Sequence, residues 1–411
     1  MWDKSYKMNL LKTKQILLIF SVVITALSCK AQQIQTILAK VENHLKGELD
    51  YTHEALELVQ TKANGEEISL GKINTDGTIH FNLPEFNIKA LYDSIPLQHY
   101  KLQDWFFMSS SCKDRDIFAE TPFDDVYSKK YDPIFIKKYG IKVAVLYPVS
   151  NEEIVSRNEN QRAVFPEDAK YFWLYIDRDI VYKDECTNAF SWGRDSDKIE
   201  ATIGVNIQFK KGWNFIEENL VEVQNVGQGD SQTTTPKHTQ FTSSSPTSKK
   251  VKWILKQIAH DGKIQIAKKL DNLTPITKEQ FEKWAPNKLG DLSVTTKKYG
   301  NLPERRKNKN NIHLIYTNEA QNKEIDLYVI DFSRNPADLE MVNFSYAMEN
   351  DGKDKKDIKP YIAQYSERKK ATQLMYKIED RIVVEASAVN INAEDLWGYT
   401  QKLNVEKLLK K

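Results

Sequence analysis

The sequence predicts a mainly β protein in two parts, an N-terminal antiparallel β-sandwich and a smaller α+β domain that ends in an amphipathic helix. Alternating apolar runs separated by Asn-Gly and Asp-Gly turns indicate the sandwich. A capped helix, a meander of alternating runs and a closing amphipathic segment indicate the second domain. Of the 411 residues, 40% are hydrophobic and 11% are aromatic, which suits folded domains with apolar cores.

Residues 1–29 form a predicted export signal, and the pattern itself covers Met8–Cys29. Lys12 and Lys14 give a positive segment ahead of Ile16–Leu27, which is uncharged and mostly apolar. This run is shorter than the roughly 20 apolar residues that a membrane-spanning helix needs. Its length is that of a secretory signal, so we expect the protein to be exported.

Two ways of cleaving this signal compete. In the first, Ala26-Leu27-Ser28-Cys29 is a lipobox, and Cys29 is lipidated and becomes the first mature residue. In the second, ordinary signal peptidase cuts after Ala31. We favour lipidation of Cys29, because the ending Leu-Ser-Cys-Lys resembles lipoprotein signals of Bacteroidota-type bacteria. Since no acidic cluster follows Cys29, we expect an outer-membrane anchor that faces the periplasm.

Residues 30–258 form the predicted sandwich. Asn64-Gly65 and Asp76-Gly77 are hairpin turn signals between alternating runs. The Thr-rich run 233–243 is predicted to be an exposed edge strand between the strands that contain Trp213 and Trp253. The predicted strands are 55–59, 67–73, 78–83, 141–147, 171–183, 198–210, 213–224, 233–243 and 251–258.

Four segments of this domain resemble a recurrent pattern of exported proteins. They are Tyr175–Asp179, Cys186, Phe209–Asn214 and Val251–Trp253. The pattern is a strand with an aspartate, a cysteine, a Lys-Lys-Gly-Trp-Asn hairpin and a closing Lys-Trp strand. The resemblance covers about residues 55–258. It implies a β-sandwich lipoprotein domain and assigns no site residues.

Residues 259–411 form the predicted α+β domain. Asp261-Gly262 indicates a turn near its start. Thr277 and Gln280 then make a capping box for a helix over Lys278–Trp284.

The rest of this domain is predicted to be a strand meander with two more helices. Apolar spacing predicts these helices over 339–348 and 392–410, the last as a lid on the sheet. The predicted strands are 291–299, 311–318, 324–332, 361–365, 371–378 and 381–388. Over about residues 272–411 this order resembles the small α+β domains of the Mog1/PsbP type, and the resemblance implies no catalytic motif.

The charge is nearly balanced, with 59 Lys and Arg residues against 57 Asp and Glu residues. A nucleic-acid partner is therefore not expected, since such proteins carry a basic excess. A local basic run, Lys297 to Lys309, is expected to be a solvated loop.

The three cysteines are Cys29, Cys112 and Cys186. If Cys29 takes lipid, the other two remain in a compartment that allows oxidation. They are then either two free buried thiols or a Cys112–Cys186 disulfide, and we favour the disulfide.

Two Asp-Arg-Asp triplets, at 114–116 and 177–179, give a candidate metal site. On a strand, residues i and i+2 share a face, so each triplet would present two carboxylates. Calcium takes six to eight oxygen ligands. Asp114, Asp116, Asp177 and Asp179 could together contribute to such a set. The alternative is that the neighbouring Arg residues and turn chemistry explain both triplets, and no cofactor is otherwise expected.

No catalytic pattern stands out. The seven histidines show no zinc-ligand spacing, and the Gly-x-Ser-x-Gly and P-loop motifs are absent. Two aromatic runs, Trp105–Phe107 and Tyr171–Trp173, could stack on sugar rings, although large aromatics on strands usually lie in a core.

We therefore expect a non-enzymatic cell-envelope lipoprotein that serves as a binding or interaction scaffold. Its expected partners are the membrane, through the lipid on Cys29, and an envelope protein or a glycan that the sequence does not identify. The alternatives are an extracytoplasmic hydrolase and a glycan-binding module, with a site at the domain junction.

Overall fold

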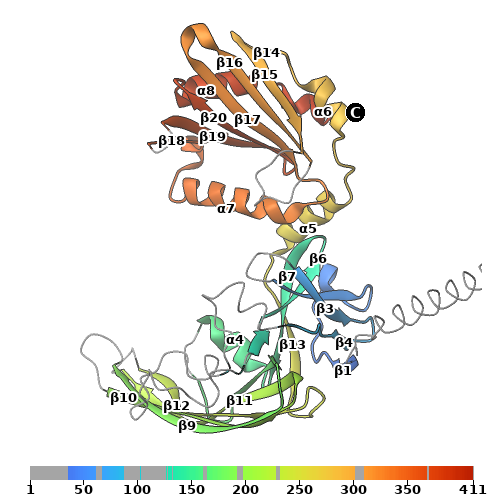
Figure 1. Ribbon diagram of the computed structural model, residues 1–411, viewed down its shortest axis with the longest axis vertical. Coiled ribbons are helices and arrows are strands. Elements are labelled where there is room, and N and C mark those ends of the chain that lie inside the picture. The colour runs from blue at the N-terminus through green and yellow to red at the C-terminus, as the bar shows by residue number, and fades with distance from the viewer. Residues whose placement is uncertain are drawn as a thin grey trace, which may run out of the picture. The chain divides into compact units, whose positions relative to one another are not determined.

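The computed structural model describes residues 36–61, 67–87, 102, 126, 128–131, 133–160, 164–191, 198–227, 232–300, 310–367 and 370–410 (Figure 1). The chain forms two compact units. Unit 1 comprises Met1–Ile136 and Ala144–Gln257, and unit 2 comprises Lys137–Val143 and Ile258–Lys411. The sequence places the boundary between residues 258 and 259, beside this division. The short segment Lys137–Val143 belongs to unit 2. A prediction with a single boundary assigns this segment to the first domain.

Among the residues that the structure describes, the strands of unit 1 belong to one 13-stranded sheet. Its strands are β1 (Thr36–Lys40), β2 (Leu56–Thr61), β3 (Glu67–Ile73), β4 (Thr78–Asn82), β5 (Ser128–Tyr131), β6 (Ile134–Lys138), β7 (Ile141–Val149), β8 (Ala169–Ile176), β9 (Ile180–Ser191), β10 (Lys198–Phe209), β11 (Gly212–Val226), β12 (Thr233–Ser243) and β13 (Lys252–Gln257). The order is β1-β4-β3-β2-β6-β7-β8-β11-β12-β10-β9, with β13 paired to β7 and β5 paired to β8.

This sheet folds back on itself around an aromatic core. Val41, just after β1, bridges to Trp253 of β13. The side chain of Asn43 exchanges hydrogen bonds of 2.9 and 2.8 Å with the backbone of Leu255. The rings packed inside are those of Phe81, Trp173, Phe215 and Trp253. The predicted β-rich first part is therefore confirmed, and its facing layers are parts of one continuous sheet.

Strands β8 to β12 form the other part of the sheet, which curves strongly in Figure 1. One of its faces carries a second apolar core. The buried residues of this core are Leu102, Val126, Phe172, Leu174, Ile176, Tyr182, Val205, Ile207, Phe209, Ile216 and Phe241.

Three details of unit 1 differ from the prediction. The sequence predicts one strand over 171–183, whereas the structure has β8 and β9, joined by a bend at Asp177–Asp179. Strand β12 is predicted at an edge beside the Trp253 strand, but it lies between β11 and β10 and is parallel to β10. This position buries Phe241 against the second core. Helix α4 (Glu153–Asn160) lies in a polar segment in which no apolar period predicts it.

Unit 2 contains a seven-stranded antiparallel sheet in the order β14-β15-β16-β17-β20-β19-β18, with helices on both faces (Figure 1). Its strands are β14 (Lys288–Leu289), β15 (Leu292–Tyr299), β16 (Asn311–Asn318), β17 (Lys323–Asp331), β18 (Ile362–Ser366), β19 (Ala371–Ile378) and β20 (Ile382–Val389). Its helices are α5 (Asp261–Asp271), α6 (Lys278–Trp284), α7 (Leu339–Asn350) and α8 (Ala393–Gln401). The predicted α+β part is thus confirmed.

Different helices cover the two faces of this sheet. Helices α6 and α8 pack on one face, where Phe281 and Leu396 join the main core of the unit. Helices α5 and α7 pack on the other face, where Leu270 and Leu339 contact a smaller cluster around Val383.

Two ends of helices in unit 2 are informative. The sequence predicts a turn at Asp261-Gly262, but helix α5 begins there, because the Nδ1 atom of His260 accepts a hydrogen bond of 3.1 Å from the Lys263 amide. The predicted lid over 392–410 is shorter than expected. Helix α8 ends at Gln401, since Asn404 takes a left-handed conformation (φ 50°) before a short 3-10 turn at Val405–Leu408.

Candidate functional site: a polar groove in unit 2

The face of the unit 2 sheet that lies opposite α6 and α8 is polar at its centre. On β17, Leu327 and Val329 belong to the main core, so Tyr328 between them projects from the opposite face. The same alternation places Asp326 of β17 and Glu385 of β20 on that face. The centre of this face therefore carries ionisable and hydrogen-bonding groups.

Strand register aligns these side chains in two neighbouring rows across β17, β20, β19 and β18. The first row is Tyr328, Glu385, Met375 and Ile362. The second row is Asp326, Ser387, Gln373 and Gln364. Directly opposed side chains in antiparallel strands are close neighbours, so each row is a continuous strip of surface.

Helix α7 packs closely on this face at its N-terminal end, where Leu339 and Val342 are buried. Met348, nearer its C-terminal end, is 65% exposed. Between this half of the helix and the sheet lies a groove of about 920 Å³. Its lining residues are Asp326, Tyr328, Ser345, Met348, Glu349, Ile362, Gln364, Gln373, Leu374, Met375, Glu385, Ala386 and Ser387.

The groove has an acidic lining. Asp326, Glu349 and Glu385 contribute carboxylates, of which Glu349 is ion-paired with Lys353 on the next turn of the chain at 2.6 Å. Burial raises the pKa of Tyr328, and the negative charges of Asp326 and Glu385 raise it further. The carboxylates of Asp326 and Glu385 therefore both act on Tyr328, at the β17–β20 end of the groove.

His313 of β16 lies beside this acidic end and is 8% exposed. Its Nε2 atom is 2.7 Å from Oδ1 of Asp326, and its ring stacks on Tyr328 with 4.3 Å between centroids. His313 lies on β16, Asp326 on β17 and Ser387 on β20, so strand β17 separates the imidazole from the hydroxyl. A serine nucleophile needs the imidazole next to its hydroxyl, and here the carboxylate lies between them. The three residues therefore do not form a hydrolytic triad.

A metal-binding role is not supported by the described side chains of either unit. Within the described ranges, no three or more His, Cys, Asp or Glu residues are grouped closely enough to hold a metal ion. The carboxylates of the groove are thus too dispersed to chelate one cation.

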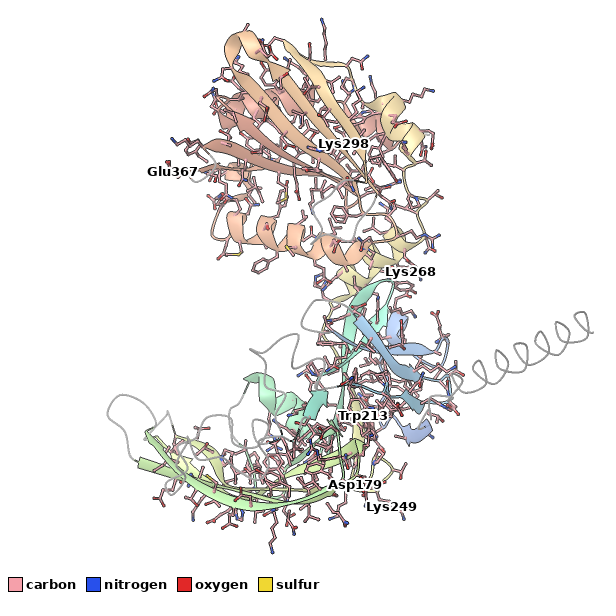
Figure 2. The ribbon with its side chains drawn as sticks, viewed as in Figure 1. Asp179, Trp213, Lys249, Lys268, Lys298 and Glu367 are labelled. Atoms are coloured by element: carbon pink, nitrogen blue, oxygen red, sulfur yellow. The ribbon has the colours of Figure 1, made fainter. Side chains whose placement is uncertain are left out.

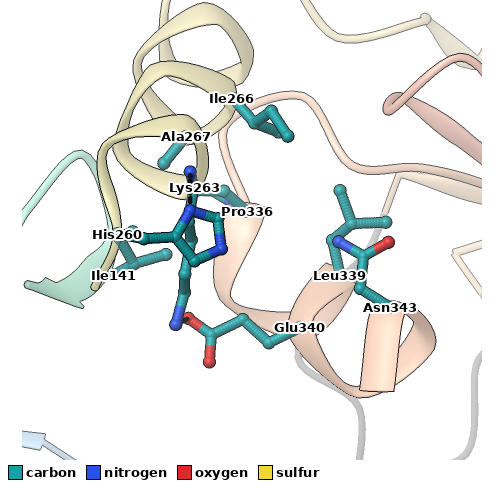
Figure 3. A pocket seen from close by; sticks show the side chains of 9 residues that line it. All are labelled: Ile141, His260, Lys263, Ile266, Ala267, Pro336, Leu339, Glu340 and Asn343. Atoms are coloured by element: carbon teal, nitrogen blue, oxygen red, sulfur yellow. Dashed lines mark hydrogen bonds and ion pairs between the residues drawn. The ribbon is translucent and has the colours of Figure 1, made fainter. Parts of the chain in front are cut away.

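Unit 2 has a second, smaller cavity of about 220 Å³ between α5 and α7 (Figure 3). Its walls are mostly apolar, with Ile266 and Leu339 among them. At its rim, Lys263 and Glu340 form an ion pair of 2.7 Å, and His260 caps α5. The polar groups at this rim thus already serve the structure of the two helices.

The structure places one half of the predicted calcium site in the bend between β8 and β9, and not on a strand. Asp177 is paired with its neighbour Arg178 at 3.2 Å. Asp179 accepts hydrogen bonds from the Lys211 amide (2.7 Å) and the Lys210 ammonium (3.1 Å), and these bonds lower the pKa of its carboxyl. The prediction of a strand with both carboxylates on one face is therefore wrong for this triplet. The other two predicted ligands, Asp114 and Asp116, lie outside the described residues.

The bend and the Lys-Lys-Gly-Trp-Asn hairpin form one structure (Figure 2). The side chain of Asn214 bonds to both the amide and the carbonyl of Lys210. Gly212 supplies a positive φ of 99°. The indole of Trp213 packs on Tyr175 and donates a hydrogen bond of 2.8 Å to the Pro84 carbonyl. The motif is therefore explained by its role in shaping this turn.

The other predicted site residues fall into two groups. Cys29 and Cys112 lie outside the described residues, as does the aromatic run 105–107. Cys186 is buried in β9. In the run Tyr171–Trp173 all three rings are buried, with exposures of 2–4%, so this run offers no platform for a sugar.

Comparisons of the chain with protein-family models, with curated proteins and with solved structures found no match. None of the helices in the described part of the chain is long and apolar enough to span a membrane.

The sequence did not reveal the groove, because its residues come from four strands and one helix. A weak local signal is present, since Asp326 and Tyr328 alternate with buried neighbours on β17, as Glu385 and Ser387 do on β20. Such alternation is also what any half-exposed strand shows. Only the sheet order brings the four residues together.

Proposed function

We propose that the protein is a non-enzymatic binding protein of the cell envelope, and that the groove of unit 2 is its ligand-binding site. The observation that carries the proposal is the groove itself. Its volume of about 920 Å³ lies within the range of roughly 300–1,000 Å³ typical of ligand sites, and polar and apolar side chains line it together.

The chemistry of the groove favours binding over catalysis. The His313–Asp326 pair is the group at the groove that most resembles a catalytic acid-base pair. Strand β17 lies between the strand of His313 and the strand of Ser387, so the imidazole is separated from that hydroxyl. A serine hydrolase requires these two groups in contact.

Exposed apolar side chains next to the groove support the same proposal. Met341, Phe344 and Met348 on α7 are 72%, 63% and 65% exposed. Their spacing places them along one side of the helix. Methionine adapts its shape to different partners, which makes such a surface suitable for binding.

We further propose that the protein is exported, that a lipid on Cys29 holds it in the outer membrane facing the periplasm, and that Cys112 and Cys186 form a disulfide. The signal pattern of residues 1–29 supports the first two statements. The burial of Cys186 and the pairing of two cysteines in a compartment that allows oxidation support the third. If two thiols per chain react before reduction in the denatured mature protein, the disulfide is contradicted.

The binding function is tested by filling the groove. Ser345 lines it from α7, so Ser345→Trp places a large ring inside. Ala347 lies on the same helix, is exposed and does not line the groove, so Ala347→Trp is the matched control. Each immobilised protein is incubated with detergent-solubilised envelope. We expect a component that the wild type and the control retain and that Ser345→Trp loses; equal retention by all three proteins contradicts the proposal.

A further inference from the structure

We infer that two copies of the chain associate through β18, the edge strand of the unit 2 sheet, and form a two-fold symmetric dimer. Strand β18 is the last in the strand order, and no other strand in the described part of the chain pairs with its outer side (Figure 1). An edge strand presents backbone N–H and C=O groups with which another extended chain can pair. The occupant that this edge fits is therefore a strand.

Strand β18 has few of the features that usually keep an exposed edge from pairing. Its residues, Ile362–Ser366, include no charged side chain and no proline. Gln364 and Tyr365 are exposed. By contrast β9, an edge strand of the unit 1 sheet, contains the charged run Lys183–Glu185. Charged side chains on an edge oppose the addition of a strand, so β18 is the more receptive of the two edges.

Symmetry limits the ways in which two copies of β18 can pair. A two-fold axis perpendicular to the sheet makes the two strands antiparallel, and every contact then occurs twice. Directly opposed side chains project from the same face of a sheet. Ile362 and Gln364 line the groove on one face, whereas Ala363 packs against the main core on the other. The axis must therefore pass through a residue of the strand.

The charges just beyond the two ends of β18 select the position of this axis. An axis at Ala363 sets Lys359 of one copy opposite Glu367 of the other. Both side chains are exposed, and neither forms an ion pair with another residue in the described ranges. Figure 2 shows Glu367 at the outer margin of unit 2. Because of the symmetry, this favourable pair forms twice, once at each end of the interface.

The two neighbouring positions of the axis bring like charges together. If the axis moves by one residue towards the C-terminus, Lys359 is opposite Lys369. If it moves by one residue towards the N-terminus, Asp357 is opposite Glu367. Like charges that face each other destabilise a pair of strands. The charge pattern therefore favours the register centred on Ala363.

This register also pairs two tyrosines across the interface. Tyr361 is buried, its ring stacks on Trp397 with 4.8 Å between centroids, and its outer neighbour is the ammonium of Lys359 at 5.4 Å. The axis at Ala363 sets Tyr361 opposite Tyr365 of the second copy, which is 57% exposed in a single chain. Aromatic pairs across neighbouring strands are stabilising, so the dimer gives this exposed ring a partner.

On the other face, the second copy extends the groove. Ile362 of one copy is opposite Gln364 of the other, so each row of groove side chains continues into the second chain. The two grooves then open on the same face of one joined sheet, because directly opposed residues share a face. Dimer formation does not depend on what the groove binds, so the test with Ser345→Trp and the tests below can fail separately.

Sedimentation equilibrium of the full mature protein measures the association, in a density-matched detergent if the chain carries lipid. We expect a reversible equilibrium between monomer and dimer, and a weak one, because a single pair of strands makes a small interface. A wild-type chain that stays monomeric up to its solubility limit would overturn the inference.

Charge reversal then tests the register. Lys359→Glu and Glu367→Lys each create two like-charge pairs in the homodimer, and each should weaken self-association by about tenfold. A mixture of the two variants has opposite charges at both ends of the interface, so it should form a heterodimer about as well as the wild type self-associates. Lys288→Glu is the matched control, since this exposed lysine lies on β14 at the opposite edge of the same sheet. It should leave the association unchanged.

The chain that carries both Lys359→Glu and Glu367→Lys again has opposite charges throughout. It should dimerise like the wild type, and it serves as the second variant if a single variant folds poorly. Self-association that neither single variant weakens would place the interface elsewhere and reject β18. Weakening by Lys288→Glu to the same extent, or failure of both the mixture and the double variant to associate, would likewise reject the register centred on Ala363.

Discussion

Asp331, at the end of β17, is a charged residue with no exposed surface. The guanidinium of Arg381 donates hydrogen bonds to both carboxylate oxygens of Asp331, at 3.0 and 3.2 Å. The amides of Ile276 and Ser333 donate to the same carboxylate at 2.7 and 3.1 Å. This network ties β17 to the segment before α6, so its role is structural.

Removing one partner of a buried ion pair leaves the other charge unpaired. We therefore expect Asp331→Ala to lower the free energy of unfolding by about 3–5 kcal/mol. Urea denaturation of the variant measures this loss. Asp354→Ala, at an exposed carboxylate, is the control and should change stability by less than about 0.5 kcal/mol. If both substitutions lower the free energy of unfolding equally, the buried network adds no more stability than an exposed carboxylate does.

Tyr346 of α7 gives a pH-dependent contribution at the residue scale. Burial raises its pKa to about 12 from the ordinary value of 10.0, and its hydroxyl donates a 3.2 Å hydrogen bond to the Met375 carbonyl. Because the folded pKa is the higher one, its stabilising contribution is complete below pH 10 and is lost as the pH rises towards 12.

We expect stability to fall between pH 10 and about 12, and to fall less steeply in Tyr346→Phe, which has no proton to lose. Denaturation at a series of pH values measures both slopes. Tyr365, which is 57% exposed, provides the control Tyr365→Phe. If Tyr346→Phe and the control give the same slope as the wild type, the buried hydroxyl does not contribute.

At the scale of elements, the sequence is most informative where a local rule fixes both ends. Helix α6 begins and ends as predicted, because both hydrogen bonds of the Thr277–Gln280 capping box form. The prediction fails at α5, since the cap there is His260, which the usual cap preferences do not include. It also fails at Asp177–Asp179, where a bend divides the single strand predicted over 171–183, because the distant backbone amide of Lys211 donates a hydrogen bond to Asp179.

The hairpin that contains Gly212 depends on a backbone conformation that other residues adopt only at a cost in free energy. Its φ of 99° is costly for a residue with a Cβ, although an added Cβ would meet no neighbouring atom within 4 Å. We expect Gly212→Ala to lower the free energy of unfolding by about 1–2 kcal/mol through backbone strain alone.

The matched substitution is Gly398→Ala. Gly398 lies inside α8, is exposed and also has no neighbouring atom within 4 Å of an added Cβ. Alanine favours a helix over glycine, so this change should raise stability by about 0.5–1 kcal/mol. Denaturant midpoints of the two variants give the comparison, and a shift of the same sign in both would contradict the assignment of their conformations.

At the scale of the whole molecule, the sequence predicts where the strands lie in the chain far better than it predicts which strands pair in the sheet. Strands β3, β16 and β19 have the predicted ends, because alternation within each is local information. The insertion of β12 between β10 and β11, and the rows that build the groove, depend on pairing between distant segments. Such pairing is decided by which faces become buried together, and no window of the sequence contains that information.

The expected location of the molecule depends on how its first residues are cleaved and whether Cys29 is lipidated, and both can be measured directly. If Cys29 is lipidated, the mature chain begins at that cysteine and carries acyl chains. If ordinary signal peptidase acts, the mature chain begins at Gln32 and carries none. We expect the first outcome, since small residues precede the cysteine in Ala26-Leu27-Ser28-Cys29.

Mass spectrometry of the N-terminal peptide from the native host distinguishes the two, and partition into a detergent phase reports on the lipid. Cys29→Ala should move the protein from the detergent phase to the aqueous phase, because two or more acyl chains are what hold such a protein stably in a bilayer. Lys30→Ala leaves the cysteine in place and should stay in the detergent phase. A wild-type chain that starts at Gln32 without lipid would remove the anchor, and unit 2 would then bind its ligand as part of a freely diffusing exported protein.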